Sequence, residues 1–162
     1  DKIKIIERPK HLCGDEVSMN KIIEYDLSHT YSDFFIMTHT TNPLLSKATI
    51  GSCIDDYLIK SNLSNYDSLF TVNAIQTRFY TKTGKPINHN PKKLVPTQDL
   101  DKMYEENSNL YIFSKESFLS TASRIGKNPI LFETPKNEAI DIDTNEEWEM
   151  AESMAFYKKR NL

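Results

Sequence analysis

Two aspartates near the C-terminal end, Asp141 and Asp143, are the residues whose type and spacing most directly indicate chemistry. In a β-strand, residues two positions apart point to the same face, so a strand at 139–142 ending there would place the carboxylates side by side. Such carboxylates repel unless a cation lies between them, and Mg²⁺ favours carboxylate oxygens together with substrate phosphates. In the alternative interpretation, Asp143 caps the following helix and Asp141 is solvated. Taken alone, the spacing favours this alternative.

The loop that begins at Arg8-Pro9 and continues to Asp15 and Ser18 is the second candidate. The apolar run at 3–6 predicts a short buried strand, because the residue before a proline prefers extended backbone. A loop between a strand and a helix N-terminus offers backbone donors and a guanidinium. These groups can bind a phosphate or the acceptor edge of a base. An ordinary connecting loop with a surface arginine is the alternative, and spacing alone favours it.

The polar loop at 38–43 follows the apolar run at 34–37 and is the third candidate. Its threonine, histidine and asparagine side chains can hydrogen-bond the hydroxyls of a sugar. His39 can instead act as a general base. A polar loop without any ligand is the alternative. His11 and Cys13 are two potential metal ligands without partners, so we predict no zinc.

The segment 104–111 combines acidic, amide and aromatic side chains beside a predicted strand. Asparagine and serine favour turns, so a turn is the alternative interpretation of this segment. Thr144 and Glu147 have the spacing of a capping box and predict the start of a final helix. Trp148 and the methionines that follow it are predicted to lie in the core.

Strands and helices must alternate to position these loops. The first half predicts strand, helix, strand, helix and strand, at 3–6, from Ser18, at 34–37, from about Ser46 and at 68–74. This alternation predicts an α/β three-layer sandwich with a mainly parallel sheet. Ligands of such sheets bind outside the carboxyl ends of the strands, so the loops after Ile6 and Met37 are expected on one rim.

The second half of the chain has a different pattern. A hairpin is expected around Thr83-Gly84, followed by a long polar loop at 88–103. Long loops in compact domains are often functional. Short strands are then predicted at 109–113, 129–133 and 139–142, with a helix at 116–121.

Composition limits the class of protein. Hydrophobic residues make up 38% of the 162 residues, enough to build a core, and the net charge of −3 gives no basic surplus for nucleic acid or an anionic membrane. The two cysteines, Cys13 and Cys53, are too few for a disulfide framework. No apolar run approaches the ~20 residues of a membrane span. We therefore predict a cytoplasmic protein.

Taken in order, four motifs resemble the acylneuraminate (CMP-sialic acid) cytidylyltransferases. Arg8-Pro9, Leu12, Asp15 and Ser18 resemble the RP..L..D..S stretch of that family, and 41–44 (TNPL) resembles its TSPL loop. The stretch 96–111 resembles its linker and dimerisation hairpin. The segment 139–144 (AIDIDT), with the following Trp148 and Ala151-Glu152, resembles its C-terminal metal motif. The resemblance covers nearly the whole chain.

The resemblance implies a nucleotide-diphospho-sugar-transferase-like α/β fold with a small dimerisation hairpin lobe. It implies a single domain over 1–162, in which about 76–133 includes the dimerisation and sugar-pocket insertion. It also implies roles for individual residues: catalysis and Mg²⁺ binding by Asp141 and Asp143, nucleotide binding by Arg8, Asp15 and Ser18, and sugar binding by His39, Thr41, Asn107 and Tyr111.

The activity implied by the resemblance is the transfer of CMP from CTP to a nine-carbon acidic sugar, such as sialic or legionaminic acid. The anomeric hydroxyl would attack the α-phosphate and pyrophosphate would leave. The implied partners are CTP, the acidic sugar and a second copy of the chain in a homodimer. Transfer to the eight-carbon sugar KDO is a related possibility. A non-catalytic fragment that binds nucleotide or dimerises is the alternative from another class.

Three departures from the family pattern matter. The strand and glycine-rich loop that grip the triphosphate in that family are missing, so this chain alone is expected to be N-terminally truncated and inactive. Thr97 and Glu105 stand where the sialic enzymes carry arginines, and we hypothesise that Arg124, or Lys92 and Lys93, compensate. The aromatic pair that the partner subunit contributes in that family has no clear match near Arg124.

Overall fold

A four-stranded sheet lies at the centre of the computed structural model, which describes residues 3–160. The ends of the predicted domain 1–162 therefore lie outside the described residues. The strands are β1 (Phe34–Thr38), β2 (Ser68–Ile75), β3 (Met103–Ser114) and β4 (Pro129–Glu133), in the order β1-β3-β2-β4. The helices are α1 (Met19–Ser28), α2 (Lys47–Leu63), α3 (Lys115–Thr121) and α4 (Asn145–Arg160), with short 3₁₀ turns at Lys10–Leu12, Thr97–Asp99 and Lys136–Glu138.

The sheet is mixed. Strands β2 and β4 pair in parallel, whereas β3 is antiparallel to both β1 and β2. Three strands thus run in one direction, as predicted, but the reversed β3 separates β1 from β2. Strand β3 follows β2 in the chain and pairs beside it after the long connection at 76–102. A connection that turns back on the same side of the sheet, as in a hairpin, gives antiparallel pairing.

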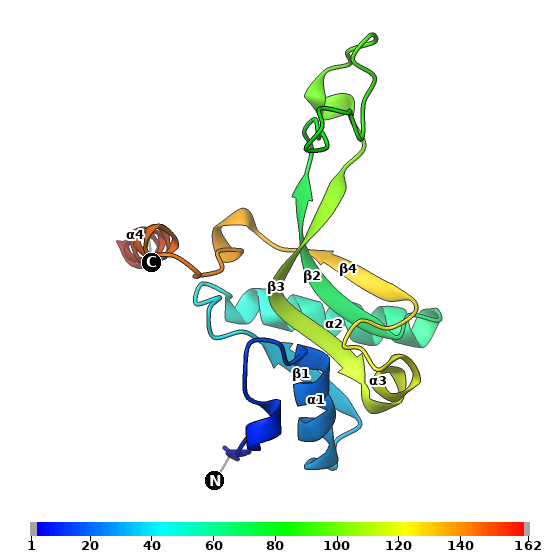
Figure 1. Ribbon diagram of the computed structural model, residues 1–162, viewed down its shortest axis with the longest axis vertical. Helices are drawn as coiled ribbons and strands as arrows, with labels where there is room; N and C mark the ends of the chain where they lie inside the picture. Colours follow the sequence, from blue (N-terminus) through cyan, green and yellow to red (C-terminus); the bar gives the residue numbers. More distant parts are fainter. Residues whose placement is uncertain (1–2, 161–162) are drawn as a thin grey trace.

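Helices cover both faces of the sheet (Figure 1), which confirms the predicted three-layer α/β fold. On one face, Cys53 and Tyr57 of α2 pack against buried side chains of β2, β3 and β4. On the other face, Ile23 and Leu27 of α1 pack with Phe118 of α3 against β3. The alternation of β3 side chains between these two clusters follows from the two-residue period of a strand.

Serine side chains begin three of the helices. Ser18 accepts a hydrogen bond from the amide of Asn20 at 3.3 Å, and Ser46 accepts one from the amide of Thr49 at 3.1 Å. Ser114 caps α3 in the same way. These bonds satisfy amides that the first helical turn leaves without partners, so the predicted helix starts at Ser18 and Ser46 are confirmed.

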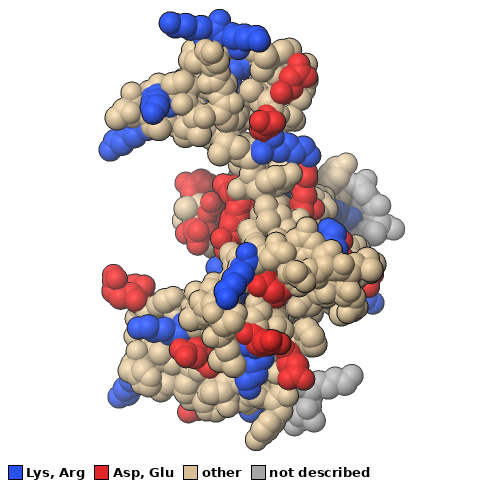
Figure 2. Space-filling view, turned by 90° about the vertical axis from the view of Figure 1, so that its right-hand side faces the viewer, with Lys and Arg blue, Asp and Glu red and all other residues tan. Residues whose placement is uncertain are grey.

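Residues 76–102 form an arm that projects from the sheet between β2 and β3 (Figure 1). The predicted hairpin is reduced there to a single bridge between Tyr80 and Pro86. Figure 2 shows that lysine and arginine side chains gather on this arm, which carries Lys82, Lys85, Lys92 and Lys93. The arm covers the first part of the predicted insertion at about 76–133, whose later residues form most of β3, α3 and β4 within the layers. Helix α4 also lies apart from the sheet (Figure 1).

Two predicted strands are absent from the described residues. The run at 3–6 is coil, and the side chain of Ile5 is 86% exposed. The segment 139–142 is also coil without a ladder partner. A short apolar run becomes a strand only when a neighbouring backbone pairs with it over several residues. Among the described residues, 3–6 has no such partner, and 139–142 makes a backbone hydrogen bond from Ile142 to Thr41 but forms no ladder.

Two predictions of burial are also wrong. The continuous apolar run at 34–37 is typical of a central strand covered on both faces, but β1 lies at an edge of the sheet and Phe34 is 62% exposed. Trp148 was expected in the core, but it is 60% exposed on α4, and Met150 is also exposed. Helix α4 itself begins as predicted, because Glu147 accepts from the amide of Thr144 at 2.8 Å and its own amide donates to the Thr144 hydroxyl at 3.3 Å. No helix within residues 3–160 is long and apolar enough to cross a membrane.

Candidate functional site

The loop after β1 is hydrogen-bonded to the segment that contains Asp141. The amide of Ile142 donates to the carbonyl of Thr41 at 2.9 Å, and the Asn42 side-chain amide donates to the carbonyl of Ile140 at 3.2 Å. These two bonds join residues about a hundred positions apart in the sequence. They place Asp141 at the carboxyl end of β1, close enough to His39 for its charge to affect the histidine ring.

A bulge in β3 forms the neighbouring wall. Pairing between β2 and β3 changes register between Phe70 and Val72, and Ser108 opposite has a left-handed backbone with φ of 57°. The Thr71 hydroxyl between them accepts from the amide of Leu110 at 2.9 Å and donates to its carbonyl at 3.2 Å. A bulge of this kind redirects side chains and is often found beside a functional site.

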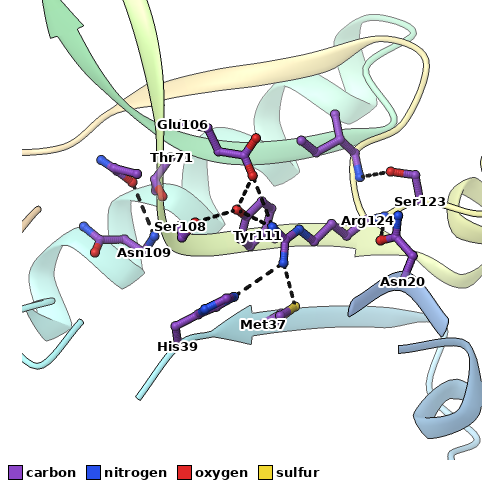
Figure 3. A network of polar contacts seen from close by, with 12 residues as sticks. Asn20, Met37, His39, Thr71, Glu106, Ser108, Asn109, Tyr111, Ser123 and Arg124 are labelled. Atoms are coloured by element: carbon purple, nitrogen blue, oxygen red, sulfur yellow. Dashed lines mark hydrogen bonds and ion pairs between the residues drawn. The ribbon is translucent and has the colours of Figure 1, made fainter. Parts of the chain in front are cut away.

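Arg124 joins these elements in one polar network (Figure 3). Its Nη2 donates to the hydroxyl of Tyr111 at 2.9 Å and to the carboxylate of Glu106 at 3.2 Å. Its Nη1 lies 3.4 Å from Nε2 of His39. The hydroxyl of Tyr111 also donates to Glu106 and contacts Ser108 at 3.3 Å. The network therefore unites the end of β1, the bulge of β3 and the loop after α3.

His39 is held as a neutral imidazole. Burial lowers the pKa of His39 below 6.5, and the adjacent charge of Arg124 lowers it further, although Asp141 and Glu106 act in the opposite direction. An arginine only donates hydrogen bonds, so the Nε2 that faces it must accept and the proton resides on Nδ1. At neutral pH, His39 therefore has an N–H group to donate and lacks the charge that would repel a cation.

Tyr111 is held as a neutral phenol. Burial raises the pKa of Tyr111 to about 12, and the hydrogen bond to Glu106 contributes in the same direction. The guanidinium carbon of Arg124 lies 3.9 Å from the centre of its ring, a cation–π contact. The ring is buried against α1 and α3, so it forms a rigid base for the arginine.

A cavity of about 360 Å³ opens between the bulge and the Asp141 segment. Glu106, Asn107 and Ser108 form its β3 wall, and Ile140 and Asp141 form the opposite wall, with Asn73, Glu105, Ala139, Glu147 and Met150 completing it. The volume suits a monosaccharide-sized ligand. Four of its lining residues carry carboxylates, so the charge of any ligand or cofactor is decisive for binding.

The predicted metal residues differ in their surroundings. One carboxylate oxygen of Asp141 is buried and has no hydrogen-bond partner, as expected for an oxygen that awaits a cation. Asp143 is exposed, and its backbone amide donates to Glu147 at 2.9 Å. Residues 3–160 contain no group of three or more histidine, cysteine or acidic side chains arranged for a metal. Because 139–142 is coil in place of the predicted strand, strand geometry does not bring the two carboxylates to one face. Mg²⁺ binds through one or two carboxylates plus waters and phosphates, so the unpartnered oxygen of Asp141 is the feature that fits it.

The predicted nucleotide residues lie in the loop before α1. Arg8 and Asp15 are exposed, and Ser18 caps the helix. This helix start is connected to the polar network, because the amide of Arg124 donates to the side chain of Asn20 at 3.3 Å. The loop after α3 therefore links the predicted nucleotide loop to the cluster around His39.

The predicted sugar residues occupy one region, but their polar groups differ in availability. His39 and Thr41 lie on the loop after β1, and Asn107 and Tyr111 lie on β3. The amide of Asn107 donates to Asn73 at 3.0 Å and to Thr134 at 2.6 Å, and its oxygen accepts from the amide of Asn109 at 3.3 Å. Asn107 therefore stabilises the bulge in this structure.

Glu106 and Ser108 were missed as site residues by sequence reasoning. Ser108 lies between two asparagines at the start of the predicted strand 109–113, and such a cluster of turn-forming residues beside a strand is a recognisable sign of a bulge. No comparable local signal marks Glu106, because its importance depends on Arg124, which is distant in the sequence.

No protein-family model matches the chain, but it is similar to a curated protein and to a solved structure. The chain is 26% identical over 167 aligned residues to post-translational flagellin modification protein B of Campylobacter coli, covering 96% of this chain and 68% of that protein. Its structure resembles that of 4-diphosphocytidyl-2C-methyl-D-erythritol synthase from Anaerococcus prevotii, with a TM-score of 0.56, 11% identity and coverage of 87% of this chain and 67% of that one. This likeness confirms the predicted nucleotide-diphospho-sugar-transferase-like α/β fold.

Proposed function

We propose that this chain is part of a cytidylyltransferase, an enzyme that transfers CMP from CTP to a nine-carbon acidic sugar and releases pyrophosphate. A fold shared with a protein named for a diphosphocytidyl product supports the nucleotidyl transfer. The relative from Campylobacter coli is named for the post-translational modification of flagellin. The nine-carbon acidic sugar as the acceptor rests on the resemblance of the sequence motifs to the acylneuraminate cytidylyltransferases. These observations are similarities to other proteins, whereas the chemistry depends on the residues of the site.

The observation that carries the proposal is the meeting of Thr41 and Ile142 through a 2.9 Å backbone hydrogen bond. This bond brings the predicted metal segment to the predicted sugar loop, at the end of a strand where ligands of α/β sheets bind. An acceptor hydroxyl and a nucleotide phosphate must meet at one point for transfer. The junction beside Asp141 and His39 provides such a point.

The residues present can bind and orient both substrates. The Nδ1–H of His39 can donate to an acceptor oxygen, and the guanidinium of Arg124 can bind an anion beside it. Asp141 and Asp143 would hold Mg²⁺, which when bound neutralises charge on the phosphates and the leaving pyrophosphate. Arg8 and the 15–18 segment would bind the base. Positioning and electrostatic stabilisation then account for most of the rate enhancement.

We further propose that the arm at 76–102 contributes to a homodimer. It projects from the layers and exposes apolar side chains, including Ile87 and Leu94, beside its lysines. Light scattering of the full-length protein would give twice the monomer mass. Deletion of 81–95 would give the monomer mass, whereas an unchanged mass would exclude the arm from the interface.

The activity is tested by pyrophosphate release from CTP. The full-length protein is incubated with CTP, Mg²⁺ and each of several nine-carbon acidic sugars, and KDO serves as an eight-carbon comparison. Release that depends on Mg²⁺ and on one nine-carbon sugar is the expected result. Absence of release with every sugar would reject the enzymatic function and favour a non-catalytic binding module.

A further inference from the structure

We infer that Arg124 binds the carboxylate of the acidic acceptor, and that the carboxylate of Glu106 occupies this position in the free protein. The inference rests on the proposed function, because it names the group that recognises the acceptor. It identifies a specificity-determining residue within the site and predicts that the protein's own carboxylate is exchanged for that of the ligand.

The position of the Glu106 carboxylate has the properties of an anion site. One oxygen of this carboxylate accepts from Nη2 of Arg124 at 3.2 Å and from the hydroxyl of Tyr111. Two converging donors, one of them charged, are what a ligand carboxylate requires. Glu106 is 41% exposed in its side chain, whereas Arg124 is only 17% exposed. The arginine is therefore fixed in the protein, and the glutamate can rotate into solvent.

The exchange is energetically accessible. A half-exposed ion pair contributes on the order of 0–1 kcal/mol, because water screens the two charges and the side chains lose rotational freedom. Arg124 keeps its orientation when Glu106 leaves, since the Tyr111 ring lies beneath its guanidinium and the backbone of Arg124 is bonded to Asn20. A preorganised guanidinium loses little freedom when it binds a carboxylate.

The location of Arg124 makes it a better candidate than Lys92 or Lys93 for binding the carboxylate of the acceptor. Lys92 and Lys93 are exposed on the arm, which projects away from the network (Figure 1). Arg124 contacts His39, which lies on the loop fastened to the Asp141 segment (Figure 3). A carboxylate bound to Arg124 in place of Glu106 would bring the rest of the acceptor near the other carboxylates of the cavity, those of Glu105, Asp141 and Glu147. The arginine therefore offsets repulsion that would otherwise exclude an acidic ligand.

A guanidinium can also bind a phosphate of CTP, so the experiment must separate the two anions. The full-length protein is assayed for pyrophosphate release with the nine-carbon acidic sugar that gives the highest rate and with the carboxamide of the same sugar. The variants are Arg124→Gln, Arg124→Lys and Glu106→Gln. Arg160→Gln, which changes an exposed arginine on α4, is the matched control. Urea unfolding checks that each variant is folded.

We expect Arg124→Gln to raise the KM for the acid at least about tenfold, as loss of a charge-assisted hydrogen bond implies. The KM for the carboxamide and for CTP should change less than about threefold. Arg124→Lys should give an intermediate KM for the acid, and Glu106→Gln should lower it or leave it unchanged. These results together would support the exchange.

Other results would overturn the inference. An equal rise in KM for acid and carboxamide would make Arg124 a positioning residue, and a rise for CTP alone would make it a phosphate ligand. A higher KM for the acid in Glu106→Gln would show that Glu106 supports binding rather than occupying the site. If the wild-type protein releases no pyrophosphate with any sugar, the proposed function fails first and the inference fails with it.

Discussion

The guanidinium of Arg124 lies over the ring of Tyr111, 3.9 Å from its centre, and also donates to the hydroxyl of the same residue at 2.9 Å. One buried tyrosine thus fixes the arginine through both its ring and its hydroxyl. The loop after α3 is held against β3 by this contact, so the position of the cation depends on a core residue.

Substitution of Tyr111 separates the two contributions. Tyr111→Phe keeps the ring and removes the hydroxyl, so we expect a loss of about 1 kcal/mol in the free energy of unfolding. Tyr111→Leu also removes the cation–π contact and leaves space in the core, so the loss should reach about 2–4 kcal/mol. Urea unfolding measures both. Equal losses for the two variants would show that the ring contact contributes nothing.

His39 should titrate below the usual histidine range. Burial and Arg124 both lower the pKa of His39 from 6.5, so the imidazole signals in an NMR titration should shift at a pH below that value. Arg124→Gln removes one of these causes, and the midpoint should rise. If the titration midpoint of His39 is unchanged in Arg124→Gln, this result would contradict the 3.4 Å contact between the two side chains.

Glu138 connects the 3₁₀ turn at Lys136–Glu138 to the start of α2. Burial tends to raise the pKa of Glu138, but hydrogen bonds from Ser46 and Thr49 and the charge of Lys158 outweigh it, so the pKa falls below 4.5. The carboxylate accepts from the amide of Ser46 at 2.9 Å, at the positive end of the helix dipole.

Glu138→Gln should therefore cost about 1–2 kcal/mol of stability at pH 7. Because folding lowers this pKa, the stabilisation is complete above pH 4.5 and is lost as the pH falls through the folded-state value. Unfolding curves at several pH values should show a constant difference between wild type and variant at neutral pH, and a smaller difference below pH 4.5. A difference that grows in acid would reverse the assigned sign.

Gly126 lies against Asp67, and a methyl group there would lie 2.2 Å from the aspartate's carboxylate oxygen. Asp67 cannot easily move, because it accepts from the amides of Lys127 at 2.7 Å and Asn128 at 3.1 Å. Gly126→Ala should cost about 1–3 kcal/mol in the free energy of unfolding through this overpacking.

Gly51 provides the matched control for this substitution. It lies inside α2, and a methyl group there would meet no other atom within 4 Å. Gly51→Ala should therefore stabilise the protein by about 0.5–1 kcal/mol, because alanine has the higher helix propensity. Urea unfolding should show opposite signs for the two variants, and equal effects would refute the steric argument.

Asp141 tests the metal site. We expect Asp141→Asn to lower pyrophosphate release about 10²-fold or more at saturating CTP, as for other groups that stabilise transition-state charge. Higher Mg²⁺ concentrations should recover part of the activity if the carboxylate binds the ion. Asp55→Asn, on the exposed side of α2, is the control and should retain full activity. Equal activity of both variants would remove Asp141 from the site.

Local sequence patterns were sufficient for most of the elements. A serine before an apolar helical face predicted α1 and α2, and the spacing of Thr144 and Glu147 predicted the start of α4. Continuous or alternating apolar runs predicted β1, β2 and β4. These signals depend on neighbours within one or two turns of the chain, so they can be read from a short window of sequence.

The absence of strands at 3–6 and 139–142 could not be predicted from a short window of sequence. Each segment has a suitable apolar pattern, but a strand needs a neighbouring backbone to pair with over several residues. Within residues 3–160, the segment 3–6 pairs with no strand, and 139–142 forms the hydrogen bond from Ile142 to Thr41 without a ladder. The same reason explains Trp148, because an apolar residue on a helix is buried only where another element covers it. Helix α4 leaves Trp148 uncovered in this structure.

The sequence by itself determined the α/β class, the helix starts and the identity of the candidate residues, because each follows from local propensity, spacing or motif. Only the tertiary structure decided that β3 separates β1 from β2 and that the Asp141 segment lies against Thr41. It also decided that Arg124, rather than Lys92 or Lys93, lies between Glu106 and His39. These arrangements depend on contacts between residues far apart in the chain, which no local pattern specifies.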